Sequence, residues 1–553
     1  MKIVIVGGVA GGMSAATRLR RLNESAEIVV LERGPYVSFA NCGLPYYIGG
    51  VIEERSQLLV QTAEKLYRRF RLDIRPHSEV VRIDRFNKQV VITHRGKTYQ
   101  ESYDRLILST GAKPTRPSIT GIDGAEGIFT LRNVPDADRI LDFIKQSGAD
   151  RAAIIGAGFI GLELAENFSH RGIKVTVIER EPQVLPPLDP EMAAEIEAEL
   201  SAHDIDVWTG KMVTRFENHG KVLVMTGGMR KQTDVTILSV GVLPESALAE
   251  QAGLKLGIRR SIAVDEQLRT SDPAIYAIGD AVEVTQTISG EETLLPLASP
   301  ANRQGRMVAD IISGIKRRYD GTLGTSIVKV FTLTAAMAGL NEKMLHRLNI
   351  PYRAVHISPP DHASYYPGNE AMTLKLLFSP ESGELLGAQA VGKKGIDKTI
   401  DVLATAIHAQ MKVDDLTGLE LAYAPPYNSA KAPVNLLGYA AQNLLEGKTQ
   451  SVQWNEIDQL IKQGSLLIDV RTEMEYKNGA IHGSVNIPLD DLRERMNEIP
   501  PHRNIIVTCQ VGLRGYLAAR ILSQSGYHVR NLDGGYKLYK TVFPEKVEDR
   551  FIN

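Results

Sequence analysis

The sequence predicts an α/β protein with two copies of one strand–turn–helix–strand unit, then an α+β segment and a C-terminal α/β domain. Strand-like apolar runs alternate with helical patterns through the first two-thirds of the chain, as in parallel sheets with crossover helices. Residues 1–32 and 151–179 share one order of strand, glycine-rich turn, helix, strand and acidic residue. Near residue 325 the pattern changes to antiparallel strands at 326–331 and 371–378, and an α/β pattern then forms the C-terminal part.

The amino-acid composition is that of an ordinary globular protein, and it argues against several classes of protein. The chain has 553 residues, of which 43% are hydrophobic, so we expect roughly three or four domains. With 64 basic and 65 acidic residues, its net charge of −1 gives no electrostatic basis for binding nucleic acid or an anionic membrane. No apolar run approaches the ~20 residues of a membrane span. Residues 1–6 predict a first strand rather than a signal peptide, so we expect a cytoplasmic protein.

Cys42 and Cys509 are the two cysteines of the chain. So few cysteines exclude a disulfide framework and a cysteine-rich metal site, and we predict no metal site. Either the two cysteines are incidental, or each serves its own chemistry.

The second copy carries the clearer nucleotide-binding motif. Gly156-x-Gly158-x-x-Gly161 follows a strand and opens a helix, so the glycines permit a tight turn and the approach of a pyrophosphate to the helix N-terminus. Glu179 lies 18 residues past Gly161, where its carboxylate can accept the ribose 2′-hydroxyls and would repel a 2′-phosphate. The pattern favours NADH over NADPH, and the neighbouring Arg180 moderates this preference.

The first copy departs from this pattern, because Val9 stands at the position of the middle glycine in Gly-Gly-Val-Ala-Gly-Gly, residues 7–12. Glu32 follows 20 residues after the last of these glycines. Two later segments support a nucleotide site here. Residues 103–112 predict a strand that ends in a small-residue turn, and residues 270–281 predict a strand that ends with a carboxylate at a helix start.

These four motifs, in this order, resemble those of the pyridine nucleotide–disulfide oxidoreductases, two-dinucleotide flavoproteins related to glutathione reductase. The resemblance covers about residues 1–445 and implies FAD on the first copy, NAD(P)H on the second, and a homodimer whose partner subunit completes the active site. It implies an FAD-binding domain at 1–113 and 245–322, an NAD(P)H-binding domain at 114–244, a dimerisation domain at 323–445 and a linker at 446–452.

The resemblance assigns the cofactor contacts to the two glycine turns, the acids that follow the second strands, and later segments, with Asp280 bonded to the ribityl chain. The implied cofactor-binding residues are Gly7, Val9, Ala10, Gly11, Gly12, Glu32, Arg33, Asn41, Thr110, Gly111, Asp280, Ala281, Pro296 and Ala298 for FAD, and Gly156, Gly158, Phe159, Ile160, Gly161, Glu179, Arg180 and Gly241 for NAD(P)H.

Cys42 lies in Ser-Phe-Ala-Asn-Cys-Gly-Leu-Pro-Tyr-Tyr, residues 38–47. Glutathione-reductase relatives carry a Cys-x4-Cys pair, but Tyr47 stands at the second position, so the chemistry must use one sulfur, as a sulfenate or a mixed disulfide with a small thiol. Within the single-cysteine branch this segment most resembles the coenzyme A–disulfide reductases. The peroxidases of that branch carry a histidine at the position of Ala10, which argues against peroxide as the substrate.

A coenzyme A substrate needs cations for its phosphates, and Arg18 and Arg21 lie one turn apart on the first helix. A solvated basic face is the alternative for each arginine. By resemblance, Tyr427 reaches the active site from the partner subunit, where its phenol can donate a proton to the departing thiolate. The second family tyrosine corresponds to Tyr365 or Tyr366, with Tyr366 assigned to catalysis. The implied coenzyme A contacts are Ser14, Arg18, Arg21, Ser38, Asn41, Arg71 and Tyr365.

Cys509 follows the predicted strand 504–508 and opens the loop Cys-Gln-Val-Gly-Leu-Arg before a helix predicted to begin near Tyr516. A loop at a helix N-terminus points amide N–H groups inward and favours a thiolate or persulfide anion. The Cys-x4-Arg loop is one residue shorter than the Cys-x5-Arg loop of phosphatases and suits a terminal sulfur.

With the segments 467–471, 479–488 and 532–535, this loop resembles that of a single rhodanese domain at 453–553. The resemblance implies that Cys509 carries a persulfide and that Arg514 helps to hold the charge of the substrate.

Together the resemblances predict a flavoprotein that uses NADH to reduce S–S bonds of coenzyme A persulfide, polysulfide or coenzyme A disulfide through Cys42. Coenzyme A is a substrate or a bound carrier, and the rhodanese domain supplies or relays sulfane sulfur while sulfide is released. Two alternatives stay open: an NADH oxidase or peroxidase that uses a cysteine sulfenate, and a non-catalytic sulfur carrier or redox sensor.

Overall fold

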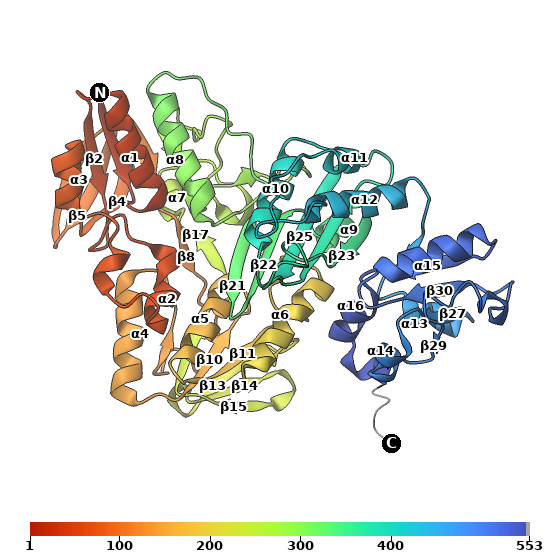
Figure 1. Cartoon of the computed structure of the whole chain (residues 1–553). Helices are drawn as coiled ribbons and strands as arrows, with labels where there is room; N and C mark the ends of the chain where they lie inside the picture. Colours follow the sequence, from red (N-terminus) through yellow and green to blue (C-terminus); the bar gives the residue numbers. More distant parts are fainter. Residues whose placement is uncertain (549–553) are drawn as a thin grey trace. The chain divides into compact units, whose positions relative to one another are not determined.

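The computed structural model describes residues 1–548, which belong to two compact units (Figure 1). The first unit comprises Met1–Pro182 and Asp204–Thr322, and the second comprises Gln183–His203 and the chain from Leu323 onward. No helix among the described residues combines the length and the apolar character that a membrane span requires.

Two parallel five-stranded sheets organise the first unit, one for each sequence copy (Figure 1). The interior of these sheets is apolar, and Ile3, Val4 and Ile5 of the first strand are fully buried, as expected for parallel strands covered on both faces. In spatial order the strands of the first sheet are β18 (Ile275–Ala277), β7 (Arg105–Leu108), β1 (Lys2–Val6), β2 (Glu27–Leu31) and β3 (Asp73–Arg75). Those of the second sheet are β12 (Asp206–Trp208), β11 (Lys174–Ile178), β10 (Arg151–Ile155), β16 (Val235–Leu238) and β9 (Ile128–Phe129).

Helices and small antiparallel sheets complete this unit. The helices are α1 (Ala10–Leu22), α2 (Leu44–Gly49), α3 (Ala63–Phe70), α4 (Val134–Ser147), α5 (Phe159–His170), α7 (Ala247–Gln251) and α8 (Ala298–Ile312), with short 3-10 turns at η1 (Asn41–Gly43) and η6 (Gly279–Ala281). The antiparallel strands are β4 (Ser78–Asp84), β5 (Gln89–His94), β6 (Lys97–Ser102), β8 (Ala112–Pro114), β13 (Val213–Glu217), β14 (Val222–Met225), β15 (Arg230–Gln232), β17 (Val242–Pro244), β19 (Val284–Thr285) and β20 (Glu292–Thr293).

The register of the first sheet brings its loops together. Val6 lies opposite both Leu31 and Leu108, and Leu108 lies opposite Ala277. Four parallel strands therefore end at the same level, and the loops that follow them leave from one edge of the sheet.

The second sheet repeats this arrangement. Ile155 lies opposite Ile178 on one side and Leu238 on the other. The glycine turn after β10, the acid after β11 and the turn after β16 therefore meet at one edge.

The second unit contains an antiparallel five-stranded sheet and a parallel five-stranded sheet (Figure 1). In spatial order the first has β21 (Ser326–Val330), β22 (Leu333–Gly339), β25 (Leu385–Gly392), β24 (Met372–Phe378) and β23 (Arg353–Ile357), and the second has β26 (Ser451–Val452), β31 (Val529–Leu532), β30 (Ile505–Thr508), β27 (Leu466–Asp469) and β29 (Val485–Asn486).

Residues 446–452, expected as a linker, include β26 of the parallel sheet. The small sheet of β28 (Ala480–Ile481) and β32 (Val547–Glu548) lies near the end of the described chain. The helices of this unit are α6 (Pro190–Ala202), α9 (Glu342–Leu348), α10 (Ile396–His408), α11 (Val413–Thr417), α12 (Pro433–Leu445), α13 (Ile457–Lys462), α14 (Glu473–Lys477), α15 (Leu513–Gln524) and α16 (Gly535–Val542).

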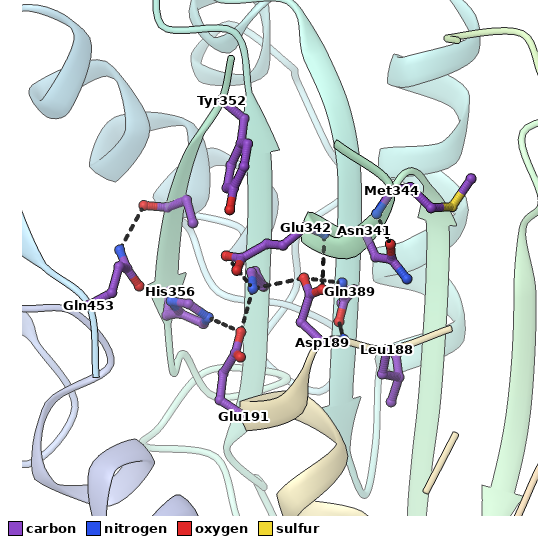
Figure 2. Close-up of polar contacts among 12 residues, drawn as sticks. Leu188, Asp189, Glu191, Asn341, Glu342, Met344, Tyr352, His356, Gln389 and Gln453 are labelled. Carbon is purple, nitrogen blue, oxygen red and sulfur yellow. Dashed lines mark hydrogen bonds and ion pairs between the residues drawn. The ribbon is translucent and has the colours of Figure 1, made fainter. Parts of the chain in front are cut away.

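A buried lysine links the antiparallel sheet to α6. Every residue of β24 is buried, including Lys375, whose Nζ lies 2.8 Å from an oxygen of Asp189 and 2.8 Å from one of Glu342. Figure 2 labels these two acids. The ammonium group also contacts Glu191. Burial disfavours the charged ammonium, but the three carboxylates outweigh it and raise the pKa of Lys375 above its ordinary value. The lysine therefore supplies the positive charge for this acidic cluster.

We expect Lys375→Met to lower the free energy of unfolding by about 3–5 kcal/mol, because three carboxylates would lose their buried counter-charge. Chemical denaturation followed by circular dichroism measures this loss. The control is Lys393→Met, whose ammonium lies 3.9 Å from Glu370 at the surface and should change stability by less than about 1 kcal/mol. Equal stability of the two variants would contradict the proposed role of the buried lysine.

Candidate functional site

The glycine turn after β10 has the backbone of a nucleotide cradle. Gly156 has a φ of +104°, and a Cβ at Gly161 would lie 2.1 Å from the Gly156 carbonyl oxygen, so the turn itself requires both glycines. A Cβ at Gly158 would meet no atom within 4 Å, so this position leaves open space at the start of α5. No side chain caps the first N–H groups of α5, and they are available to a phosphate.

Glu179 closes this cradle from the end of β11. Its carboxylate is buried and accepts the Ala157 N–H at 2.7 Å and the Glu181 N–H at 2.9 Å. An ionised carboxylate has about four acceptor sites, so the two ribose hydroxyls of a dinucleotide can still be bound. Arg180 is exposed and pairs with Glu181 at 2.9 Å. Gly241 follows β16 at the same edge of the sheet.

The first copy forms the same cradle despite its departure in sequence. Gly7 has the same φ of +104° as its counterpart in the second copy. Glu32 accepts the Gly8 N–H at 2.8 Å and the Gly34 N–H at 2.7 Å. Val9 has a φ of −108°, which residues with side chains adopt without strain. The missing glycine therefore does not distort the turn, and α1 also begins without a side-chain cap.

Asp280 lies in η6 at the edge where the first sheet gathers its loops. Burial raises the pKa of its carboxyl group, although Arg132 opposes the shift. Within residues 1–548 no donor forms a hydrogen bond with this carboxylate, which suits a bound hydroxyl group. Arg132 donates to the Thr110 carbonyl at 3.1 Å, and burial lowers its pKa. Arg132 belongs to no motif, and sequence reasoning missed it.

Cys42 lies in η1, exposed at the surface of the first unit in this chain. Partial desolvation raises the pKa of its thiol, and the negative charges of Glu163 and Asp280 raise it further. Glu163 lies on α5, where burial raises the pKa of its own carboxyl group to about 7, and it accepts the Tyr46 hydroxyl at 3.3 Å. Glu163 was not predicted from the sequence because no motif includes it. Burial and these two charges therefore disfavour the Cys42 thiolate.

Other residues assigned to coenzyme A lie on or near α1. The Ser14 hydroxyl donates to Asn302 of α8 at 2.6 Å, and Arg18 donates to the buried Asp310 at 2.7 Å. Arg21 is exposed and donates to the Thr17 carbonyl of its own helix at 3.0 Å. The structure thus places Arg18 in the packing of α1 against α8 and leaves Arg21 the more accessible cation.

Other residues predicted to bind FAD or coenzyme A lie near Cys42, at the end of α3 and at the start of α8. The Ser38 N–H donates to the Gly8 carbonyl at 2.8 Å, which ties the cysteine segment to the first glycine turn. Asn41 is exposed beside Cys42, and Arg71 ends α3 with a φ of +49°. Pro296 and Ala298 lie at the start of α8, whose N-terminus carries no side-chain cap.

In the second unit, the predicted tyrosines are exposed on two segments that are joined by a hydrogen bond. Tyr365, Tyr366 and Tyr427 expose 72%, 42% and 73% of their surface. The Tyr365 hydroxyl lies 2.6 Å from that of Tyr423, and the backbone of residue 363 donates to that of residue 428 at 3.0 Å. Such exposed aromatic groups are typical of a surface that a partner covers.

A histidine missed by sequence reasoning lies beside these tyrosines. His362 is buried, with Nδ1 2.7 Å from an Asp361 oxygen and its ring packed against Tyr366. Its Nε2 has no hydrogen-bond partner among the described residues. No motif marked this pair, although an adjacent Asp and His next to family tyrosines was a usable signal.

Cys509 begins the loop after β30 and is buried, with 1% of its surface exposed. Its Sγ accepts the Gly512 N–H at 3.1 Å. Helix α15 begins at Leu513 and not near Tyr516, so the predicted start was wrong. Gly512, with a φ of +101°, turns the chain early, and the helix therefore supplies its free N–H groups closer to the sulfur.

Arg514 lies in the first turn of α15 and forms two hydrogen bonds with Glu475, at 2.7 and 2.6 Å. This pairing, with further backbone and threonine donors, lowers the pKa of Glu475 to about 2. A second arginine, Arg471, is buried at the loop, donates to Asp469 and reaches Gln510 at 3.4 Å. The loop is thus held between two arginine–carboxylate pairs, and Arg514 is the more accessible cation.

The family model for pyridine nucleotide–disulphide oxidoreductases matches residues 1–305, its dimerisation domain matches 325–433, and a rhodanese-like domain matches 453–541. A reduced CoADR-RHD from Bacillus anthracis has a crystal structure similar to this chain, with 55% identity, 99% coverage of both chains and a TM-score of 0.97. A NAD-dependent persulfide reductase from A. fulgidus has 39% identity, covers 98% of this chain and 100% of its own, and gives a TM-score of 0.93.

Coenzyme A disulfide reductase of Staphylococcus haemolyticus is 37% identical over 447 residues, which is 80% of this chain and all of that protein. The chain therefore belongs to the pyridine nucleotide–disulphide oxidoreductase family and adds a C-terminal rhodanese-like domain. This confirms the predicted enzyme class and fold. Membership implies FAD and a nicotinamide dinucleotide as cofactors, and the dimerisation domain indicates a homodimer.

We expect Glu163→Gln to lower the pKa of the Cys42 thiol, because it removes a nearby negative charge that disfavours the thiolate. Iodoacetamide alkylation at pH 8, measured in a Cys509→Ser background so that one thiol remains, should become about threefold faster. The control is Glu64→Gln, which changes an exposed carboxylate on α3. An unchanged or slower alkylation rate in Glu163→Gln would contradict this electrostatic role.

Proposed function

We propose that this protein uses NADH and FAD to reduce the S–S bond of coenzyme A persulfide, polysulfide or coenzyme A disulfide. The carrying observation is that the chain has two thiols in different settings, Cys42 near the cofactor edge and Cys509 in a rhodanese loop. The similarity to CoADR-RHD and to a NAD-dependent persulfide reductase over nearly the whole chain supports this pairing of domains.

The cofactor contacts follow from the two cradles. Glu32 and Glu179 each use their carboxylate to fix a glycine turn and retain acceptor sites for ribose hydroxyls. Asp280 offers a half-buried carboxylate to further hydroxyl groups of FAD. FAD, when bound, supplies the two-electron relay between NADH and the sulfur centre.

The proposed reductive step starts from the Cys42 thiolate. It attacks the coenzyme A sulfur of coenzyme A persulfide, the S–S bond breaks, and hydrosulfide leaves. The resulting disulfide between Cys42 and coenzyme A takes up two electrons that originate from NADH, together with one proton, and becomes the Cys42 thiolate and coenzyme A. Tyr427 of a second copy donates this proton to the departing coenzyme A thiolate.

The proposed sulfur-loading step uses Cys509. Its thiolate attacks the outer sulfur of thiosulfate or of polysulfide, the S–S bond of the donor breaks, and sulfite or a polysulfide shorter by one sulfur leaves. The Cys509 persulfide that forms is held as an anion by the loop N–H groups. The coenzyme A thiolate then attacks the outer sulfur, which regenerates the Cys509 thiolate and forms coenzyme A persulfide. Arg514, at the rim of the loop, attracts the anionic donor.

The first test is anaerobic NADH oxidation by the FAD-loaded protein with coenzyme A persulfide and, separately, coenzyme A disulfide, with sulfide measured. We expect one sulfide for each NADH with the persulfide. Cys42→Ser should lower both activities at least about 100-fold because it removes the nucleophile. Cys509→Ser should leave them within about twofold and abolish turnover that depends on thiosulfate. Turnover that resists Cys42→Ser would refute the proposal, and oxygen consumption in place of S–S reduction would favour an NADH oxidase.

The nucleotide preference rests on Glu179. Glu179→Gln keeps the size of the side chain but removes the charge that opposes a 2′-phosphate, so we expect kcat/KM for NADPH relative to NADH to rise about tenfold. Steady-state kinetics with both nucleotides measures this ratio. Glu181→Gln, which alters the neighbouring side chain that pairs with Arg180, is the control and should leave the ratio within about twofold.

A further inference from the structure

His356 joins three elements of the second unit that are distant in the sequence. It lies in β23 and is buried. Its Nδ1 lies 2.7 Å from an oxygen of Asp533 in the rhodanese domain, and its Nε2 lies 3.1 Å from an oxygen of Glu191 on α6 (Figure 2 shows the latter contact). The His356 backbone N–H also donates to both Asp533 oxygens at 3.1 Å.

The charges around this ring favour its protonated form. Burial opposes the charge, but Asp533 and Glu191 outweigh burial and the repulsion from Lys375, and they raise the pKa of His356 to about 9. A doubly protonated imidazole donates from both nitrogens, which matches a carboxylate at each one. The two domains are therefore joined by an ion pair that is closed to solvent.

Asp533 lies on a chain segment that packs directly against the Cys509 loop. It immediately follows β31, and two residues later Gly535 packs so closely that a Cβ there would lie 2.5 Å from the Cys509 carbonyl oxygen. The Tyr536 N–H donates to that same oxygen at 2.7 Å. The position of Asp533 therefore determines the position of the Cys509 loop.

Two further contacts hold the same face. Gln453 donates to Asp533 at 3.1 Å and reaches the Ala354 carbonyl beside His356 at 3.4 Å. Lys537 of α16 donates to Thr373 of β24 at 3.0 Å. A domain that was merely tethered by a chain segment would need no buried ion pair, and an apolar contact would avoid the cost of desolvating two charges. The pair is suited to selecting one orientation.

We propose that the His356–Asp533 pair is a positioning contact for sulfur transfer. It holds the rhodanese domain on the dimerisation domain so that the Cys509 persulfide passes its outer sulfur to coenzyme A in one docked arrangement. This inference rests on the proposed relay function, and both residues act through the orientation of the domain and not by contact with the reacting sulfur. Docking holds the tethered domain in one orientation, which a flexible chain segment by itself does not.

The test compares three activities in Asp533→Asn and His356→Gln. The first is NADH oxidation with preformed coenzyme A persulfide, which needs Cys42. The second is thiocyanate formation from thiosulfate and cyanide, which needs Cys509. The third is sulfide release from thiosulfate and NADH with substoichiometric coenzyme A, which needs both sites.

We expect the third activity to fall at least about tenfold in both variants while the first two stay within about twofold. His482→Gln is the matched control, since it breaks an exposed histidine–carboxylate pair with Glu548 in the same domain, and it should resemble the wild type.

The double variant His356→Gln/Asp533→Asn separates positioning from folding. It replaces the ion pair by two neutral amides that can still form a hydrogen bond, so it should recover part of the coupled activity lost in Asp533→Asn. The inference is overturned if the coupled activity stays within about twofold of wild type in both single variants, or if all three activities fall together.

Failure of the proposed function would be visible in the wild-type protein, as absent sulfide release in the first activity. The His356–Asp533 contact can then still be tested by a separate measurement. Hydrogen exchange of the His356 backbone amide should accelerate at least about tenfold in Asp533→Asn, because its acceptor is weakened, and no acceleration would overturn the contact.

Discussion

Parallel strand pairing is the constraint on which both nucleotide cradles depend. Because Val6, Leu108 and Ala277 end at one level in the first sheet, the glycine turn, the acid after β2 and the Asp280 turn meet at a single edge. The second sheet repeats this arrangement, and Glu179 fixes its glycine turn by accepting the Ala157 N–H. Without this alignment the motifs would be unrelated loops, and neither α1 nor α5 would have a nucleotide cradle at its N-terminus.

The two thiols have different surroundings, and their proposed roles follow from this difference. Cys42 is exposed and close to Glu163 and Asp280, whose charges disfavour its thiolate. Its reactivity therefore depends on what binds beside it. Cys509 is buried and accepts a backbone N–H from Gly512, which is the contact that the proposed persulfide would use. In the proposed mechanism, one chain thus combines a thiol that a bound group must activate with a loop that holds a persulfide.

Buried charge organises the second unit in a comparable way. The antiparallel strands β24 and β25 are buried along their whole length, so Lys375 has no route to water and must be neutralised within the protein. The acids that do this come from α6 and α9, and Glu191 also contacts His356. The same network therefore fixes α6 on the sheet and reaches the rhodanese domain. Such contacts select a unique arrangement at a cost in desolvation.

The sequence by itself determined the features that neighbouring residues encode. Strand–turn–helix order, the spacing of Gly156 to Gly161 and the length of the Cys509 loop are local backbone properties, and they predicted the family and both thiol sites. The tertiary structure decided what distant segments do to each other: Glu163 beside Cys42, and His356 opposite Asp533, 177 residues away. Periodicity and spacing carry no information on such pairs, because they depend on how whole helices and sheets pack and on which charges that packing removes from water.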